Sequence, residues 1–223
     1  MGTHSIHPEL LRRRVRVLVV GCGATGSAVA GGLPHLHQAL IAYGHPEGLH
    51  VTVMDGDLIS PTNCVRQPFS RFESGHYKAL VLVNRLNLFW NLGWEALPEH
   101  LTGKEPLDRI DVVIGCVDTR ASRAVIRDRT SGSSTVAYVL DIGNTSDSGQ
   151  SILGEPLNQV NRRSRTRLRS VFELYPLWFR NHNGYYAVSK ICSLITTRPD
   201  PVRARRIRRP HNLSKGTKES HQR

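Results

Sequence analysis

The chain has 223 residues, which is enough for one sizeable hydrophobic core and too few for two ample domains. No apolar run approaches the ~20 residues of a transmembrane helix, no apolar signal-peptide region is visible near Met1, and the four cysteines form no CxxC pair. We therefore expect a cytoplasmic protein without membrane contact, without a disulfide framework and without a zinc site built from paired cysteines.

Short apolar, β-branched runs alternate with helical stretches over the first 155 residues. We predict strands at 15–20, 49–54, 111–116 and 135–141, with shorter strands at 94–97 and 149–154. Helices are predicted at 27–43 with a break near Pro34, at 78–90 with Leu80, Val83 and Leu86 as its apolar face, and at 121–129. This alternation predicts a Rossmann-like α/β fold of three layers around a mostly parallel sheet.

The charge divides the chain unevenly. Residues 1–155 contain 14 Lys+Arg and 15 Asp+Glu, whereas residues 156–223 contain 16 and 3, so all of the net charge of +12 comes from the last third. We therefore predict that the α/β domain spans residues 1–155 and is followed by a weakly patterned extension (156–198) and a basic tail (199–223) that is disordered. Arginine density without structural period motivates the hypothesis that this C-terminal part is lineage-specific or comes from a shifted reading frame, which reading the other two frames of the coding DNA would test.

Three glycines, Gly21, Gly23 and Gly26, form the pattern GxGxxG directly between a predicted strand and a predicted helix. The first permits a tight turn, the second lets a phosphate approach the backbone, and the third lets helix and strand pack closely. The start of the helix favours an anion. A turn that serves packing only is the alternative, and the pattern does not distinguish NAD, FAD, S-adenosylmethionine and ATP.

Asp55 ends the second strand, where a ribose-binding carboxylate is expected. Polar residues crowd the positions that follow it: Asp57, Asn63, Arg66, Gln67 and, on the next helix, Lys78. A site that stabilises a phosphorus transition state needs such cations, and a hydride-transfer site does not. Taken singly, Arg66 could be a surface ion-pair partner, Lys78 a solvated helix residue, and Asp118, after the third strand, a helix N-cap.

Together these pieces resemble the ThiF/MoeB/HesA family of adenylating enzymes, which are related to the ubiquitin activators. The resemblance covers about residues 10–155 and rests on GCGATGS, on Asp55-x-Asp57 followed by Asn63-x-x-Arg66-Gln67, on Lys78 in GHYKAL, and on Asp118. Within the family, the nearest resemblance is to ThiF-like proteins of the plasmid-borne PRTRC system, through HPELL, LHVTVMDGD, VLVNRLN and VLDIGNTSDSGQSILG.

The resemblance implies an ATP site. The glycine turn would hold the phosphates, Asp55 the ribose, and Asp118 would help to place Mg²⁺ and the attacking carboxylate. The α-phosphate would be surrounded by residues of the signature, Asn63, Arg66 and Lys78, with Asp57 and Gln67 as further nucleotide-binding residues.

The resemblance also implies partners. The carboxylate would be the C-terminus of a ubiquitin-like (β-grasp) protein, and the products an acyl-adenylate and pyrophosphate. The enzyme would be a homodimer in which Arg12, Arg13 or Arg14 reaches into the partner subunit's site. The family's C-terminal partner-binding surface and CxxC pair are not recognisable here, which could impair adenylation.

Two other classes of function stay open. One is an NAD(P)-binding Rossmann oxidoreductase. The other is a nucleic-acid-associated protein whose basic tail makes non-specific, salt-sensitive contacts with phosphates.

Overall fold

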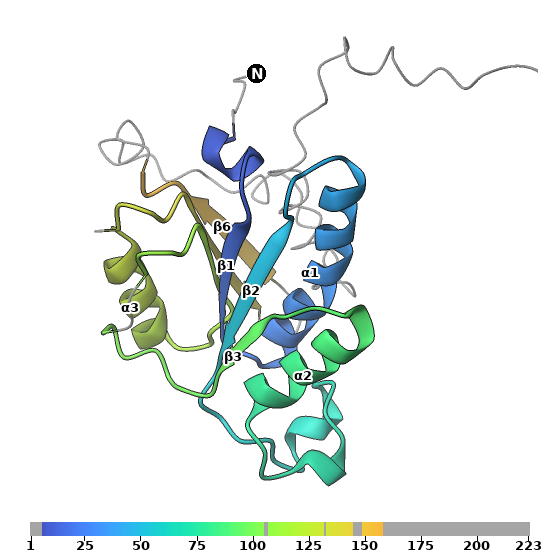
Figure 1. The fold of residues 1–223 in the computed structure, drawn as a ribbon. Helices are drawn as coiled ribbons and strands as arrows, with labels where there is room; N and C mark the ends of the chain where they lie inside the picture. The colour runs from blue at the N-terminus through green and yellow to red at the C-terminus, as the bar shows by residue number, and fades with distance from the viewer. Residues whose placement is uncertain (1–5, 105–106, 132, 145–148, 158–223) are drawn as a thin grey trace, which may run out of the picture.

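The structure, a computed structural model, describes residues 6–104, 107–131, 133–144 and 149–157, so the predicted extension beyond residue 157 and the basic tail lie outside it. A six-stranded sheet stands between two helical layers (Figure 1). The strand order is β3-β2-β1-β4-β5-β6, in which the first five strands are parallel and β6 is antiparallel to β5. The bounds are β1 Val15–Val20, β2 Leu49–Met54, β3 Glu95–Leu97, β4 Val112–Gly115, β5 Tyr138–Asn144 and β6 Gly149–Gly154. The predicted fold class is confirmed.

Helices cover both faces of the sheet. Helices α1 (Ala24–Ala42) and α2 (Lys78–Trp90) lie on one face and α3 (Arg120–Ser131) on the other (Figure 1). Along β1, Val17 and Val19 belong to the core under α1 and α2, whereas Leu18 and Val20 pack with Ile126 of α3. Burial on both faces explains why the strand is apolar without a break from Val17 to Val20, while the exposed Arg16 lies near its start. None of the described helices combines the length and the apolar character that crossing a membrane requires.

The predicted break at Pro34 is wrong, because α1 continues through this proline. A proline inside a helix removes one N–H donor and crowds the preceding turn. Here Leu33, Leu36 and Leu40 are all buried against the sheet, on both sides of the proline. Packing along the whole helix outweighs the local penalty and keeps α1 continuous.

Two further predictions need correction. On α2 the predicted face residues Val83 and Leu86 are buried, but Leu80 is 38% exposed, and Leu82 is buried in its place. Strand β5 begins at Tyr138 rather than Thr135 and continues to Asn144, because its later residues pair with β6.

The parallel register brings the ends of three strands together. Val20 is paired with Met54 of β2 and with Gly115 of β4. Just beyond, Gly21 N–H donates to Met54 O at 2.8 Å, and Cys116 N–H donates to Val20 O at 2.8 Å. The order 2-1-4 places a change of winding direction between β1 and β4, which is where ligands bind in open α/β sheets.

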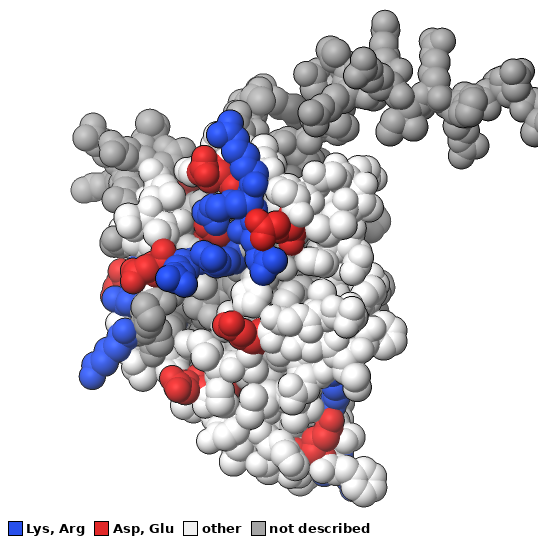
Figure 2. All heavy atoms as spheres, viewed as in Figure 1, with Lys and Arg blue, Asp and Glu red and all other residues white. Residues whose placement is uncertain are grey.

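Ion pairs fill the opposite, amino edge of the sheet, near the 3-10 helix η1 (Pro8–Leu11). Figure 2 shows its basic and acidic side chains intermingled. The buried carboxylate of Asp111 accepts two bonds from the Arg13 guanidinium, at 2.6 and 2.9 Å, and one from Arg16 N–H at 2.9 Å. The neighbouring arginines form exposed pairs, Arg12–Glu9 at 3.8 Å and Arg14–Glu47 at 3.2 Å. The three candidates for the arginine that reaches a partner's site are thus all paired within this chain, at the edge opposite the carboxyl ends of the strands.

Gly26 allows α1 to begin directly beneath the glycine turn. A Cβ at this position would lie 1.8 Å from Gly21 O, whereas a Cβ at Gly31, on the same helix, would meet no described heavy atom within 4 Å. We expect Gly26→Ala to lower the free energy of unfolding by about 2 kcal/mol or more, because the backbone must move. Gly31→Ala should raise it by up to about 1 kcal/mol through helix propensity. Urea unfolding of both variants measures the two changes, and equal effects would contradict the close approach.

Candidate functional site

A cleft of about 820 Å³ opens along the carboxyl edge of the sheet. Its volume falls within the range of about 300–1,000 Å³ that is usual for small-molecule sites. Nine of the ten predicted site residues line it: Gly21, Gly23, Asp55, Asp57, Asn63, Arg66, Gln67, Lys78 and Asp118. The tenth, Gly26, is buried beneath the turn.

The glycine turn forms one wall of the cleft. Gly21 has φ +93°, which favours glycine, and a Cβ there would lie 2.7 Å from Cys116 O. Both the backbone conformation and the close contact therefore exclude a side chain. A Cβ at Gly23 would meet no heavy atom of the described residues within 4 Å, which leaves space on the cleft side. Gly23 is also the N-cap of α1, and no described side chain caps this helix. The first N–H groups of α1 are therefore suited to an anion.

Asp55 links the turn to the end of β2. Its Oδ2 accepts a hydrogen bond from Cys22 N–H at 2.5 Å, and its Oδ1 accepts one from Asp57 N–H at 2.8 Å. A carboxylate has about four lone-pair sites, so each oxygen can still accept a ribose hydroxyl. The carboxylate is thus held in place by the turn beside which a nucleotide would lie.

Lys78 is not a solvated helix residue. It begins α2, its side chain is only 6% exposed, and its Nζ lies 2.7 Å from Asp57 Oδ2. Asp57 also accepts the Lys78 backbone N–H, at 3.0 Å, on its carbonyl oxygen. In this structure Asp57 therefore acts as the counter-ion of Lys78. Arg66, by contrast, is exposed and forms no ion pair with another described residue.

The loop that carries Arg66 is shaped by Asn63, the first residue of the 3-10 helix η2 (Asn63–Val65). Asn63 Oδ1 accepts Ser60 N–H at 2.9 Å, and its carbonyl oxygen accepts Gln67 N–H at 2.9 Å. Gln67 is buried in the cleft wall, and its Oε1 has no hydrogen-bond partner in the described part of the chain. Because a buried unpaired acceptor is costly, a ligand donor at this position would lower the free energy.

Asp118 follows β4 and is exposed at the cleft. It does not cap α3, because the Oγ1 of Thr119 accepts Ser122 N–H at 3.1 Å. The described residues contain no group of three or more His, Cys, Asp or Glu side chains that could hold a metal. A single carboxylate nevertheless fits Mg²⁺ that arrives with a nucleotide, since such ions keep several waters and phosphate ligands.

The sequence did not point to two other parts of the cleft wall. One follows β3 and comprises Glu99, His100 and Leu101. The other contains Arg123 on α3, which donates to Val117 O from Nη2 at 3.0 Å and lies 3.6 Å from Asp141 Oδ1. Burial raises the pKa of Asp141, and Arg123 partly offsets this shift. The rule that placed Asp55 and Asp118, namely that strand ends share one edge, could have found the segment after β3, but not Arg123, which lies on a helix.

Comparison with known proteins shows the family to which the chain belongs. The model of the ThiF family matches residues 9–136, more than half of the chain and the region that forms the glycine turn, the cleft loop and Asp118. No curated protein matches the chain.

Cys22 is buried and Cys116 lines the cleft, and both thiols should be unreactive. Burial, with a smaller effect of the Asp55 charge, raises the pKa of Cys22 to about 12, and burial also raises the pKa of Cys116. At pH 8 the thiolate fraction of Cys22 would be about one part in ten thousand. We expect iodoacetamide at pH 8 to leave both thiols unmodified in the folded protein and to modify them after denaturation, as read by peptide mass spectrometry. Rapid labelling of Cys22 in the folded protein would contradict this.

Proposed function

Because the chain belongs to the ThiF family, we propose that it uses ATP to adenylate a carboxylate, which gives an acyl-adenylate and pyrophosphate. Adenylyl transfer related to the activation of ubiquitin-like proteins is the chemistry of this family. The observation that carries the proposal is the convergence of the glycine turn, Arg66, Lys78 and Asp118 on one cleft.

In the proposed reaction a carboxylate oxygen attacks the α-phosphorus of ATP. The bond from this phosphorus to the oxygen that bridges to the β-phosphate breaks, and pyrophosphate leaves with that electron pair. A carboxylate is a poor nucleophile toward a polyanion, so the Arg66 guanidinium offsets the negative charge that both reactants bring, and the Lys78 ammonium contributes where a phosphate displaces Asp57 from it. Mg²⁺, bound by Asp118 and the phosphates, would supply further positive charge.

The glycine turn and Asp55 have the complementary task of holding the nucleotide. The N–H groups at the start of α1 would donate hydrogen bonds to the phosphate oxygens, and the Asp55 carboxylate would accept one from a ribose hydroxyl. Its bond from Cys22 N–H fixes the distance between these two contacts before ATP arrives. The nucleotide would then be oriented by the glycine turn after β1 and by the Asp55 carboxylate after β2.

Finer proposals rest on the family and on the resemblance in sequence. Members of the family act on ubiquitin-like proteins and often dimerise. We therefore propose the C-terminus of a ubiquitin-like protein as the carboxylate, a homodimer as the assembly, the cytoplasm as its location and a PRTRC-type ThiF-like protein as the nearest relative.

The main alternative is an NAD(P)-binding oxidoreductase, which the glycine turn and Asp55 alone would also serve. It differs in one respect that can be measured. An NAD(P) site has no use for a guanidinium at the cleft loop, so Arg66→Ala would leave NAD binding unchanged, and ATP would not support pyrophosphate exchange.

The test is ATP–pyrophosphate exchange by the full chain, with and without a ubiquitin-like protein ending in Gly-Gly. We expect exchange that depends on this protein and on Mg²⁺, and that falls by about 100-fold or more in Arg66→Ala and in Asp118→Ala, since single charge-stabilising groups usually contribute that much.

Matched controls come from the same chain. Arg71 and Asp108 are exposed and lie outside the cleft lining, so Arg71→Ala and Asp108→Ala should retain exchange. Exchange that persists in Asp118→Ala, or NAD binding with no exchange in the wild type, would refute the proposed function.

A further inference from the structure

The segment from Pro68 to Ser74 directly follows Arg66 and Gln67 and has little core of its own. It contains the 3-10 helix η3 (Arg71–Glu73), and Phe72 on it is 98% exposed. Phe69 is its only buried apolar side chain among the described residues. A segment with so few apolar contacts is expected to open locally unless polar contacts hold it.

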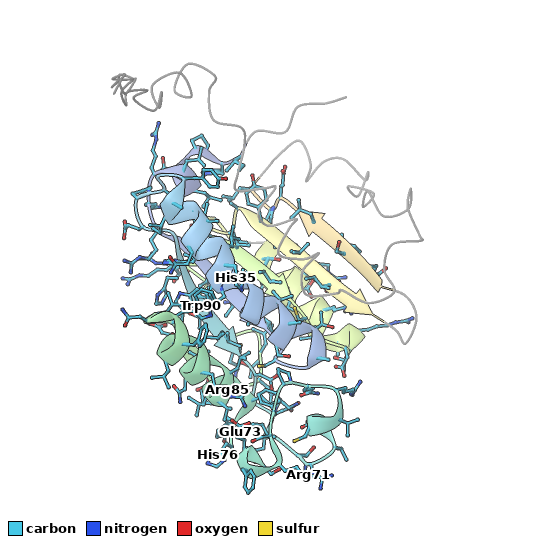
Figure 3. All side chains as sticks on the ribbon, turned by 90° about the vertical axis from the view of Figure 1, so that its right-hand side faces the viewer. His35, Arg71, Glu73, His76, Arg85 and Trp90 are labelled. Carbon is cyan, nitrogen blue, oxygen red and sulfur yellow. The ribbon has the colours of Figure 1, made fainter. Side chains whose placement is uncertain are left out.

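Arg85, on α2, supplies such contacts at both ends of the segment. Its Nη1 donates to Pro68 O at 2.5 Å, and its Nε donates to Glu73 Oε1 at 3.2 Å. Nη2 completes the fork by pairing with Glu73 Oε2. The guanidinium also lies 5.7 Å from the centre of the Phe69 ring. Figure 3 shows Arg85 and Glu73 close together, with Arg71 apart from them.

Glu73, which Arg85 holds, is itself hydrogen-bonded to the backbone of the segment. Its Oε2 also accepts Ser70 N–H at 2.7 Å, while Glu73 N–H donates to Ser70 O at 3.1 Å. The hydrogen bonds from Arg85 lower the pKa of Glu73. The carboxylate therefore stays ionised, and the contact stays formed, at neutral pH and below, until the pH falls through this lowered pKa.

An exposed ion pair usually contributes little, because solvent screens it and two flexible side chains must be ordered. Arg85 differs because its single planar guanidinium contacts a carbonyl, a carboxylate and an aromatic ring. The entropy lost in ordering this one side chain is therefore offset by several contacts. Its side chain is 41% exposed and that of Glu73 only 26%. The contact is therefore suited to fixing a conformation, whatever its effect on global stability.

The fixed segment ends at the cleft. Phe69 N–H donates to Gln67 O at 2.8 Å, and Gln67 lies buried in the cleft wall with Arg66 beside it. Arg85 itself does not line the cleft. It lies seven residues after Lys78, two turns along α2 on the same side. The same helix thus presents one cation to the cleft directly and holds the loop that presents another.

We propose that Arg85 is a positioning residue that clamps the Pro68–Ser74 segment and thereby sets Arg66 and Gln67 in the cleft. The proposal rests on the proposed function, because the residues it positions are those assigned to ATP. No contact between Arg85 and the nucleotide is involved.

The first arm of the test is ATP affinity, measured by calorimetry on the full chain. Arg85→Ala should bind ATP about tenfold more weakly, which corresponds to about 1.4 kcal/mol. The ATP affinity of Arg85→Lys should lie between those of the wild type and Arg85→Ala, because an ammonium can pair with Glu73 but cannot bond Pro68 O and both Glu73 oxygens at once. Arg71→Ala, on η3 itself, should bind like the wild type. A merely destabilised variant would lose binding stoichiometry rather than affinity.

The second arm is amide hydrogen exchange without nucleotide, read at Ser70, Glu73 and Ser74. These amides should exchange at least about fivefold faster in Arg85→Ala and at the wild-type rate in Arg71→Ala. Unchanged exchange in Arg85→Ala would overturn the clamp, and faster exchange with wild-type ATP affinity would overturn its positioning role. A wild-type chain that binds no ATP would instead refute the proposed function, and the exchange rates would still decide whether Arg85 holds the segment.

Discussion

The contact of backbone with backbone at the glycine turn is the constraint on which the carboxyl edge depends. Gly26 lies under Gly21 O, and Gly21 lies against Cys116 O, so α1, the turn and the end of β4 meet with no side chain between them. Asp55 reaches Cys22 N–H only because the turn lies this close to the end of β2. Asp118 enters the same cleft because it follows Cys116 by two residues. Because Gly21 and Gly26 have no Cβ atoms, the polar groups that follow β1, β2 and β4 can lie together at one edge of the sheet.

The two edges of the sheet differ in how completely their polar groups are paired. At the amino edge, acids of the same chain pair with Arg13 and its neighbours, and the buried Asp111 is fully engaged. At the carboxyl edge, Gln67 Oε1 has no partner among the described residues, and Arg66 forms no ion pair with them. Unpaired polar groups are costly where they are buried, so their location marks the edge that is shaped for a ligand rather than for stability.

The fold and most of the cleft could be predicted because strands buried on both faces, glycine turns and strand-end polar residues leave local signals. β1, β2, α2 and β6 have the bounds that the sequence predicts. Local signals failed where distant packing decides: Pro34 suggested a break that the sheet contact of α1 overrides, and the extension of β5 depends on its pairing with β6. The pairing of Lys78 with Asp57, and the role of Thr119 as the cap in place of Asp118, depend on side-chain directions that spacing alone does not give.

The ion pair between Lys78 and Asp57 has a consequence for which anions the cleft retains. Because the ammonium already has a carboxylate 2.7 Å away, an arriving anion gains no bare positive charge there and must compete with a resident one. Inorganic phosphate or sulfate makes few contacts that would offset the loss of the Lys78–Asp57 ion pair. A ligand that also fills the glycine turn and reaches Asp55 gains several contacts at once, so the resident carboxylate turns a general attraction for anions into discrimination by size and shape.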